Sequence, residues 1–269
     1  MKRDRKIVLK LIIIGLVLCT ALFFICKKYL SGSGKWAKDI PVLMYHHLLE
    51  EEENPYEGNS AVLPVETFRK HMALLHKKGY YTVGLDELEK FVRGEINLPK
   101  RSVLITFDDG YKSNCEYAYP ILKKYGFKAA IFLISGWNTD EVVYFDANEL
   151  QYLSWTEIEN SRDVFEYASH THDLHKLDEN GQGYLITEPL DEIRQDLETS
   201  MRILDTAYLA YPYGHYNEET LKVLEELGYR MAFTVKAGRV KPGDPLLELN
   251  RYPIFPYTSL RDFKRMIGL

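Results

Sequence analysis

The chain of 269 residues is 46% hydrophobic and 27% charged, a composition typical of a globular protein with room for one large α/β domain. Its formal net charge of −5, without a basic stripe beyond the extreme amino terminus, argues against a nucleic-acid partner. Of the three cysteines, Cys19 and Cys26 lie in an apolar segment. Cys115 is therefore alone in the rest of the chain, which excludes an internal disulfide there.

The amino-terminal segment has the pattern of a membrane anchor. Basic residues within 1–6 precede an apolar stretch at 7–26 that only Lys10 interrupts, and about 20 such residues span a bilayer as a helix. We therefore predict a cytoplasmic segment at 1–6, one transmembrane helix at 7–26, a flexible linker at 27–38 and an extracellular domain at 39–269, held at the cell membrane. A cleaved signal peptide is the alternative, although no small-x-small cleavage site follows the apolar stretch.

Beyond the linker, segments with strand and helix periodicity alternate. The predicted strands cover residues 41–45, 80–83, 103–107, 129–134, 164–168, 207–211 and 230–235, with a further short one at 252–255. The predicted helices cover residues 67–78, 86–93, 115–125, 155–160, 188–204 and 218–227. This alternation indicates a parallel sheet of about seven strands surrounded by helices, either open or closed into a barrel.

Polar side chains follow the carboxyl ends of four predicted strands. His46 follows the first, the pair Asp108 and Asp109 follows the strand at 103–107, and His170 and Tyr213 follow two later ones. In a barrel these ends meet on one face, where catalytic groups usually lie. Two adjacent carboxylates can take different roles, one holding a metal and the other moving a proton. The alternative is an ordinary Asp-Gly turn without chemistry.

The segment SHTHDLH at 169–175 places three imidazoles and one carboxylate within seven residues. His170 and His175 are five apart, which is off a common helical face, so we expect a loop that curls around a ligand. With Asp109 they make a two-histidine, one-carboxylate set that suits catalytic Zn²⁺ and also non-haem iron. His172 is a further imidazole that we expect outside the ligand set. The alternative for the cluster is a polar surface loop.

Three motifs together resemble those of the polysaccharide deacetylase family, also known as the NodB-homology domain or carbohydrate esterase family 4. They are TFDDGY at 106–111, SHTHDLH at 169–175 and AYPYG at 210–214, and the resemblance covers roughly residues 40–251. The opening PVLMYHHL at 41–48 is similar to the branch that de-N-acetylates poly-β-1,6-N-acetylglucosamine. Membrane-anchored peptidoglycan deacetylases are near relatives. The resemblance implies a distorted (β/α) barrel of about seven parallel strands, preceded here by the one transmembrane helix.

The resemblance also implies a role for each matching residue. Asp108 corresponds to the general base, and Asp109, His170 and His175 to the ligands of one divalent metal. We expect Zn²⁺, with Co²⁺ or Ni²⁺ as alternatives. Tyr213 lies where the backbone N–H of the family helps to bind the oxyanion.

The sequence departs from the family pattern at two places. Ala210 replaces the arginine that usually orients the base, and Arg251 is the candidate for the missing group. No strand ending in Leu-His occurs near the carboxyl terminus, where the family keeps its general acid. Because the first and last strands of a barrel are neighbours, we expect His46, rather than His47, to take that place.

The expected activity is metal-dependent removal of N-acetyl groups from an extracellular N-acetylglucosamine polysaccharide, with poly-β-1,6-N-acetylglucosamine favoured. Peptidoglycan, an O-acetyl ester or xylan are alternative substrates. A sugar-binding module without catalysis is the alternative from another class, because the usual arginine is absent and the acid is displaced. The sequence leaves the oligomeric state open.

Overall fold

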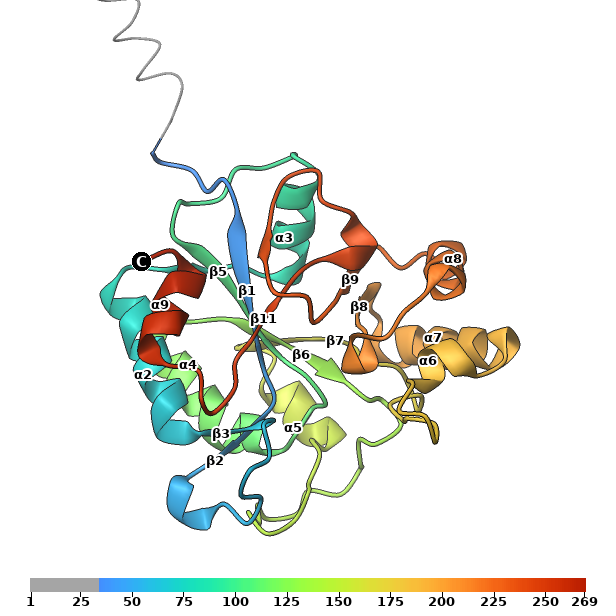
Figure 1. The fold of residues 1–269 in the computed structure, drawn as a ribbon. Coiled ribbons are helices and arrows are strands. Elements are labelled where there is room, and N and C mark those ends of the chain that lie inside the picture. Colours follow the sequence, from blue (N-terminus) through green and yellow to red (C-terminus); the bar gives the residue numbers. More distant parts are fainter. Residues whose placement is uncertain (1–33) are drawn as a thin grey trace, which may run out of the picture.

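A computed structural model describes residues 34–269, which form a curved sheet covered by helices (Figure 1). The strands are β1 (Ile40–Tyr45), β2 (His47–Leu49), β3 (Val62–Pro64), β4 (Tyr81–Thr82), β5 (Ser102–Phe107), β6 (Ala129–Leu133), β7 (Phe165–Ser169), β8 (Tyr208–Ala210), β9 (Met231–Phe233), β10 (Arg239–Val240) and β11 (Tyr252–Pro253). The helices are α2 (Val65–Lys77), α3 (Leu85–Val92), α4 (Tyr119–Tyr125), α5 (Trp155–Asn160), α6 (Tyr184–Thr187), α7 (Leu190–Leu204), α8 (Glu218–Leu227) and α9 (Leu260–Ile267).

The main sheet has the strand order β10-β1-β5-β6-β7-β8-β9, with β11 paired to β1 and β4 paired to β5. All of these pairs are parallel except β1 with β10. Helices α2, α4 and α9 lie together beside one part of the sheet, and α6, α7 and α8 lie beside the other (Figure 1). The sheet therefore presents the carboxyl ends of its parallel strands at one edge, as the alternating sequence pattern predicts.

Side chains of β1 and β5 alternate between two apolar clusters, because successive residues of a strand face opposite sides. Leu43 of β1 and Ile105 of β5 pack in the cluster that contains residues of α2, α4 and α9. Val42 and Leu104 pack in the second cluster, on the face that also contains α3. The same alternation carries Thr106 to this second face.

Strand pairing does not close the sheet into a complete barrel. The segment 249–253, called here the bridging segment, lies between β9 and β1. Leu249 at its start pairs with Phe233 of β9, and β11 at its end pairs with β1. The main sheet is therefore a half-barrel whose two ends are linked by a short irregular segment.

An α/β fold with a mostly parallel sheet is confirmed, and the predicted strands correspond to β1, β4, β5, β6, β7, β8, β9 and β11. The main sheet has nine strands in all because it also contains the antiparallel β10, which was not predicted, and of the open and closed forms it takes that of a half-barrel. The short parallel pair β2 and β3 was not predicted. Strands of two or three residues carry too few side chains to show a period, which explains these differences.

The predicted cytoplasmic segment (1–6), the transmembrane helix (7–26) and most of the linker (27–38) lie outside the described residues. Within 34–269, none of the helices has both the length and the apolar character needed to cross a membrane.

Candidate active site

The two aspartates follow β5 and leave it in different directions. The Asp108 N–H donates to the carbonyl of Tyr45 at 2.9 Å, so Asp108 still continues the pairing of β5 with β1. The backbone then bends sharply, with positive φ values of 71° at Asp109 and 77° at Gly110. A Cβ at Gly110 would lie 2.5 Å from Cδ2 of Leu133, so the bend requires glycine both for its φ and for space.

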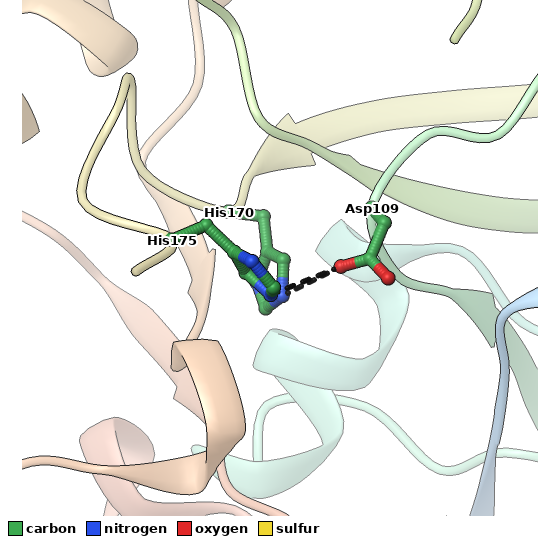
Figure 2. Close-up of side chains that lie close together, drawn as sticks. All are labelled: Asp109, His170 and His175. Carbon is green, nitrogen blue, oxygen red and sulfur yellow. Dashed lines mark ion pairs between the residues drawn. The ribbon is translucent and has the colours of Figure 1, made fainter. Parts of the chain in front are cut away.

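Asp109 meets the two histidines of the histidine loop, defined as residues 169–175, at the carboxyl end of β7 (Figure 2). Its Oδ1 lies 3.3 Å from Nε2 of His170 and 3.2 Å from Nε2 of His175. One ligand atom from each residue lies within 4.8 Å of the other two. Although burial would raise the pKa of Asp109, the neighbouring imidazoles in their protonated form hold it well below its usual value.

The hydrogen-bond partner of each Nδ1 atom determines whether the Nε2 atom of the same ring carries a hydrogen or a free lone pair. Nδ1 of His170 lies 2.7 Å from the carbonyl oxygen of Ala210, which can only accept, so Nδ1 carries the hydrogen. The Tyr213 hydroxyl donates its one hydrogen to the His175 carbonyl at 3.4 Å, so its oxygen accepts from Nδ1 of His175, which lies 3.2 Å away. In the neutral imidazoles the Nε2 lone pairs then face Asp109, as in metal sites whose histidines are held through the other nitrogen.

These residues fit a divalent cation. Oδ1 of Asp109 is buried and has no hydrogen-bond partner among the described residues. It faces two Nε2 atoms at short range, so three electron-rich atoms converge on one point. Two imidazoles and one carboxylate are a donor set that Zn²⁺ accepts while leaving positions open.

Asp108 is excluded from this set because Arg251 occupies both of its oxygens. Nη1 and Nη2 of Arg251 donate to Oδ1 and Oδ2 of Asp108 at 2.6 and 2.7 Å. The guanidinium is fully buried, donates through Nε to the Thr234 carbonyl at 3.0 Å, and lies over the rings of Phe132 and Phe233. Burial alone would raise the pKa of Asp108, but Arg251 lowers it below its usual value, which favours the ionised form.

His46 and His47 have different environments although they are adjacent. His46, half-buried between β1 and β2, is among the groups that lower the pKa of both Asp108 and Asp109. Its carbonyl accepts a hydrogen bond from Asn114 at 2.8 Å. His47 is buried with Nδ1 2.7 Å from the Ser113 hydroxyl, and burial lowers its pKa to about 4.

Two further predicted residues, His172 and Tyr213, lie next to the metal set without belonging to it. His172 is not part of the metal set, and its Nδ1 lies 3.0 Å from the Ser135 hydroxyl. Tyr213 has a positive φ of 57° in the turn after β8, and its ring lies 4.5 Å from that of His175 between centroids.

Aromatic side chains surround the metal set. Trp137 packs edge-on against His175 and against Tyr152, with ring centroids 5.7 and 5.1 Å apart. Tyr111, two residues after Asp109, stacks on Tyr152 at 5.4 Å. A few converging polar groups inside an apolar, aromatic wall are typical of a site for an organic ligand.

Comparison with known proteins agrees with this geometry. A family model described as polysaccharide deacetylase matches residues 95–232, a range that contains both aspartates and the histidine loop. The chain belongs to the polysaccharide deacetylase family. The prediction that it is an enzyme of this family is thereby confirmed, although His46 and Arg251 lie outside the matched range.

Two curated relatives illustrate the match. YxkH of Bacillus subtilis (strain 168) is 33% identical over 220 residues, covering 82% of this chain and 73% of the relative. The poly-beta-1,6-N-acetyl-D-glucosamine N-deacetylase of Staphylococcus aureus (strain MSSA476) is 35% identical over 152 residues, or 54% of this chain. The match spans about half of that relative, 51% of its length.

Two solved structures share the fold. The deacetylase PplD of Streptococcus pyogenes, in complex with acetate, aligns with a TM-score of 0.73 and 27% identity over 86% of this chain and 99% of the other. IcaB of Ammonifex degensii aligns with a TM-score of 0.74 and 25% identity over 87% and 99%. The predicted similarity to the poly-β-1,6-N-acetylglucosamine branch is confirmed.

Two contacts at the site were not predicted from the sequence. The Ala210 carbonyl holds His170, and the Tyr213 hydroxyl holds His175, whereas the sequence suggested only the backbone N–H of Tyr213. A carbonyl partner has no residue signature, since every residue has one.

Replacement of Arg251 by methionine leaves the Asp108 carboxylate buried without its cation. We expect the free energy of unfolding to fall by about 3–5 kcal/mol at pH 7. In the unchanged protein the lowered pKa of Asp108 contributes stability above the unfolded value of about 3.9, and this is lost on acidification. In the variant burial raises that pKa, so the deficit should shrink between pH 7 and pH 5 in urea unfolding experiments.

The double variant Arg251→Met with Asp108→Asn is the matched control, since it has no buried charge at this place. It should recover most of the lost stability and show little of the pH dependence. A deficit in Arg251→Met that is the same at both pH values would contradict the assigned cause.

Proposed function

We propose that this polysaccharide deacetylase removes N-acetyl groups from an N-acetylglucosamine polysaccharide, with poly-β-1,6-N-acetylglucosamine as the favoured substrate. One observation carries the proposal. Asp108, a buried carboxylate paired with Arg251, stands directly beside Asp109, which faces two imidazoles. Such a pair separates proton transfer from metal binding. The matches to the S. aureus enzyme and to IcaB support the choice of polymer.

Asp109, His170 and His175 would hold one divalent ion, and we propose Zn²⁺, with Co²⁺ or Ni²⁺ as alternatives. When bound, such an ion supplies a water of lowered pKa and polarises the acetamide carbonyl. Asp108, Asp109 and His170 are buried, and electrostatic interactions are stronger at buried groups than in water.

Asp108 is the proposed general base that takes the proton of the attacking water. Its lowered pKa keeps it ionised and able to accept a proton at neutral pH. Arg251 fixes the carboxylate through both oxygens, so that the base has one orientation. General-base assistance of this kind contributes roughly 10²–10⁴-fold to the rate.

Tyr213 and His46 are proposed to act on the other side of the scissile amide. The backbone N–H of Tyr213, in the strained turn after β8, would donate to the developing oxyanion, a contribution of about 3 kcal/mol for one donor. His46 would give its proton to the leaving sugar amine. The product carries a cationic amine at neutral pH, so the polymer gains positive charge.

A sugar-binding module on the same fold is the alternative from another class. Two departures favour it, the replacement of the usual arginine by Ala210 and the displaced general acid. The contact of Arg251 with Asp108 weakens the first of them, because a buried arginine does orient the carboxylate. A module that only binds sugar has no need of an ionised base beside a metal set.

Acetate release is the direct test of the proposed function. The purified full-length protein with Zn²⁺ should release acetate from β-1,6-linked N-acetylglucosamine oligomers, and chelation by EDTA should stop the release. Asp108→Asn should lower the rate at least 100-fold while the bound zinc, measured by elemental analysis, stays at the level of the unchanged protein. The exposed Asp191→Asn is the control for the loss of one carboxylate. Equal rates for the two variants would remove the proposed base.

The same assay separates the alternative substrates. β-1,6 oligomers, chitin oligomers, purified peptidoglycan and acetylated xylan are compared by their kcat/KM values. A preference for peptidoglycan or xylan of tenfold or more would overturn the favoured polymer but leave the deacetylase assignment in place.

His46→Gln and His47→Gln distinguish the two candidates for the general acid. We expect His46→Gln to reduce kcat by about 10²–10⁴-fold. His47, whose pKa is lowered to about 4 by burial, is neutral at pH 7 and lacks the additional proton of an imidazolium. We therefore expect His47→Gln to lower the unfolding temperature and to reduce kcat by a smaller factor than His46→Gln does. A loss of kcat for His47→Gln that exceeds the loss for His46→Gln would reverse the assignment.

We also propose that residues 7–26 anchor the enzyme as a single transmembrane helix, with the catalytic domain outside the cell. The proposal rests on the apolar stretch and the basic residues before it. Protease added to intact cells should then digest the catalytic domain. Full protection until the cells are lysed would exclude an extracellular location.

A further inference from the structure

The histidine loop has a backbone that needs external support. His170 and His175 are five residues apart, yet both aim Nε2 at the same oxygen of Asp109. Between them Thr171, a buried β-branched residue, has a positive φ of 74°. This conformation is unfavourable for a β-branched side chain and persists only where neighbouring contacts hold it.

Helix α7 supplies these contacts from its buried face. Asp196 accepts the backbone N–H of His172 on Oδ1 at 2.7 Å and that of Asp173 on Oδ2 at 2.6 Å. One helical turn further, the Ser200 hydroxyl lies 2.7 Å from the Ser169 hydroxyl. The start and the middle of the loop are thus both attached to one face of α7.

The Ser169 hydroxyl extends this attachment into the strained residue. It accepts the backbone N–H of Thr171 at 3.1 Å, so Ser200 supports Thr171 through Ser169. On the opposite side, the Thr171 carbonyl accepts the N–H of Ser135, and the His172 carbonyl accepts that of Gly136 at 2.8 Å. The segment after β6 therefore binds the carbonyls of Thr171 and His172, and α7 accepts the N–H groups of His172 and Asp173.

A carboxylate is needed at position 196 to accept two adjacent N–H groups at once. Asp196 is 9% exposed, and the charged groups that act on it, His172 and Asp173, belong to the same loop. Both of its hydrogen bonds are short, as expected when the acceptor carries charge. An apolar residue would pack on the α7 stripe beside Leu197 as well, but would leave both N–H groups buried without partners.

We propose that Asp196, together with Ser200, is a positioning residue of the metal site. Its carboxylate holds the peptide groups of His172 and Asp173 so that His170 and His175 converge on Asp109. Asp196 itself touches neither the metal ligands' side chains nor the reacting atoms. This inference rests on the metal site of the proposed function and extends it to a helix that contributes no ligand.

The test compares the Zn²⁺ dissociation constants of the full-length protein and three variants, measured by competition with a chromophoric chelator. Asp196→Asn keeps the size of the side chain but leaves one loop N–H without an acceptor. We expect its dissociation constant to rise about 10–100-fold, the range for residues that hold metal ligands indirectly. Ser200→Ala should raise it by a smaller factor. Glu198→Gln, an exposed change of the same charge on the same helix, should leave it within twofold.

A purely structural role predicts a different result. Asp196→Asn would then lower the unfolding temperature of the metal-free protein, while the folded variant would bind Zn²⁺ with an unchanged dissociation constant. That result overturns the inference. An increase of the Zn²⁺ dissociation constant in Glu198→Gln as large as that in Asp196→Asn overturns it as well. If Asp196→Asn does not fold, Ser200→Ala decides, and an unchanged constant overturns the proposal. Absence of Zn²⁺ binding by the unchanged protein would instead remove the metal site of the proposed function.

Discussion

The buried ion pair between Arg251 and Asp108 is the contact on which the site depends. It joins the end of β5 to the bridging segment across 143 residues of sequence. A guanidinium without exposure is favourable only with well-placed partners, and here both carboxylate oxygens, a carbonyl and two aromatic rings supply them. The pair thus fixes the open side of the half-barrel and the orientation of Asp108 at once.

The distinction between the two aspartates follows from this pair and from one backbone bend. Strand alternation carries Asp108 to the face where Thr106 and Arg251 lie, since the three are linked by hydrogen bonds. The left-handed backbone conformation of Asp109 then turns its own carboxylate toward the histidine loop. Of these two adjacent aspartates, Asp108 therefore contacts the Arg251 guanidinium and Asp109 faces two imidazoles. Their different chemistry has its origin in position, not in residue type.

The sequence was most informative where a residue type is rare and a strand is long. Strands β5, β6 and β7 and the grouping of Asp109, His170 and His175 could be predicted, because apolar periodicity fixes the strand ends and parallel strands bring those ends together. The sequence pointed to Arg251 only indirectly, because Ala210 stands where the family has an arginine and another arginine had to be sought. The support from Asp196 was not accessible, because a polar residue on an amphipathic helix looks the same whether it faces water or a neighbouring loop.

The position of His46 at the front of the domain is consistent with the half-barrel topology. Strand β1 pairs with β5 on one side and with β11 on the other, so the first strand of the domain borders the last. A residue that follows β1 therefore reaches the same edge as one that follows a carboxyl-terminal strand. Strand adjacency, rather than chain order, decides which side chains share the edge. The proposed acid role of His46 then requires no change in the fold, only that β1 extend to the level of Asp108, as the hydrogen bond from the Asp108 N–H to the Tyr45 carbonyl indicates.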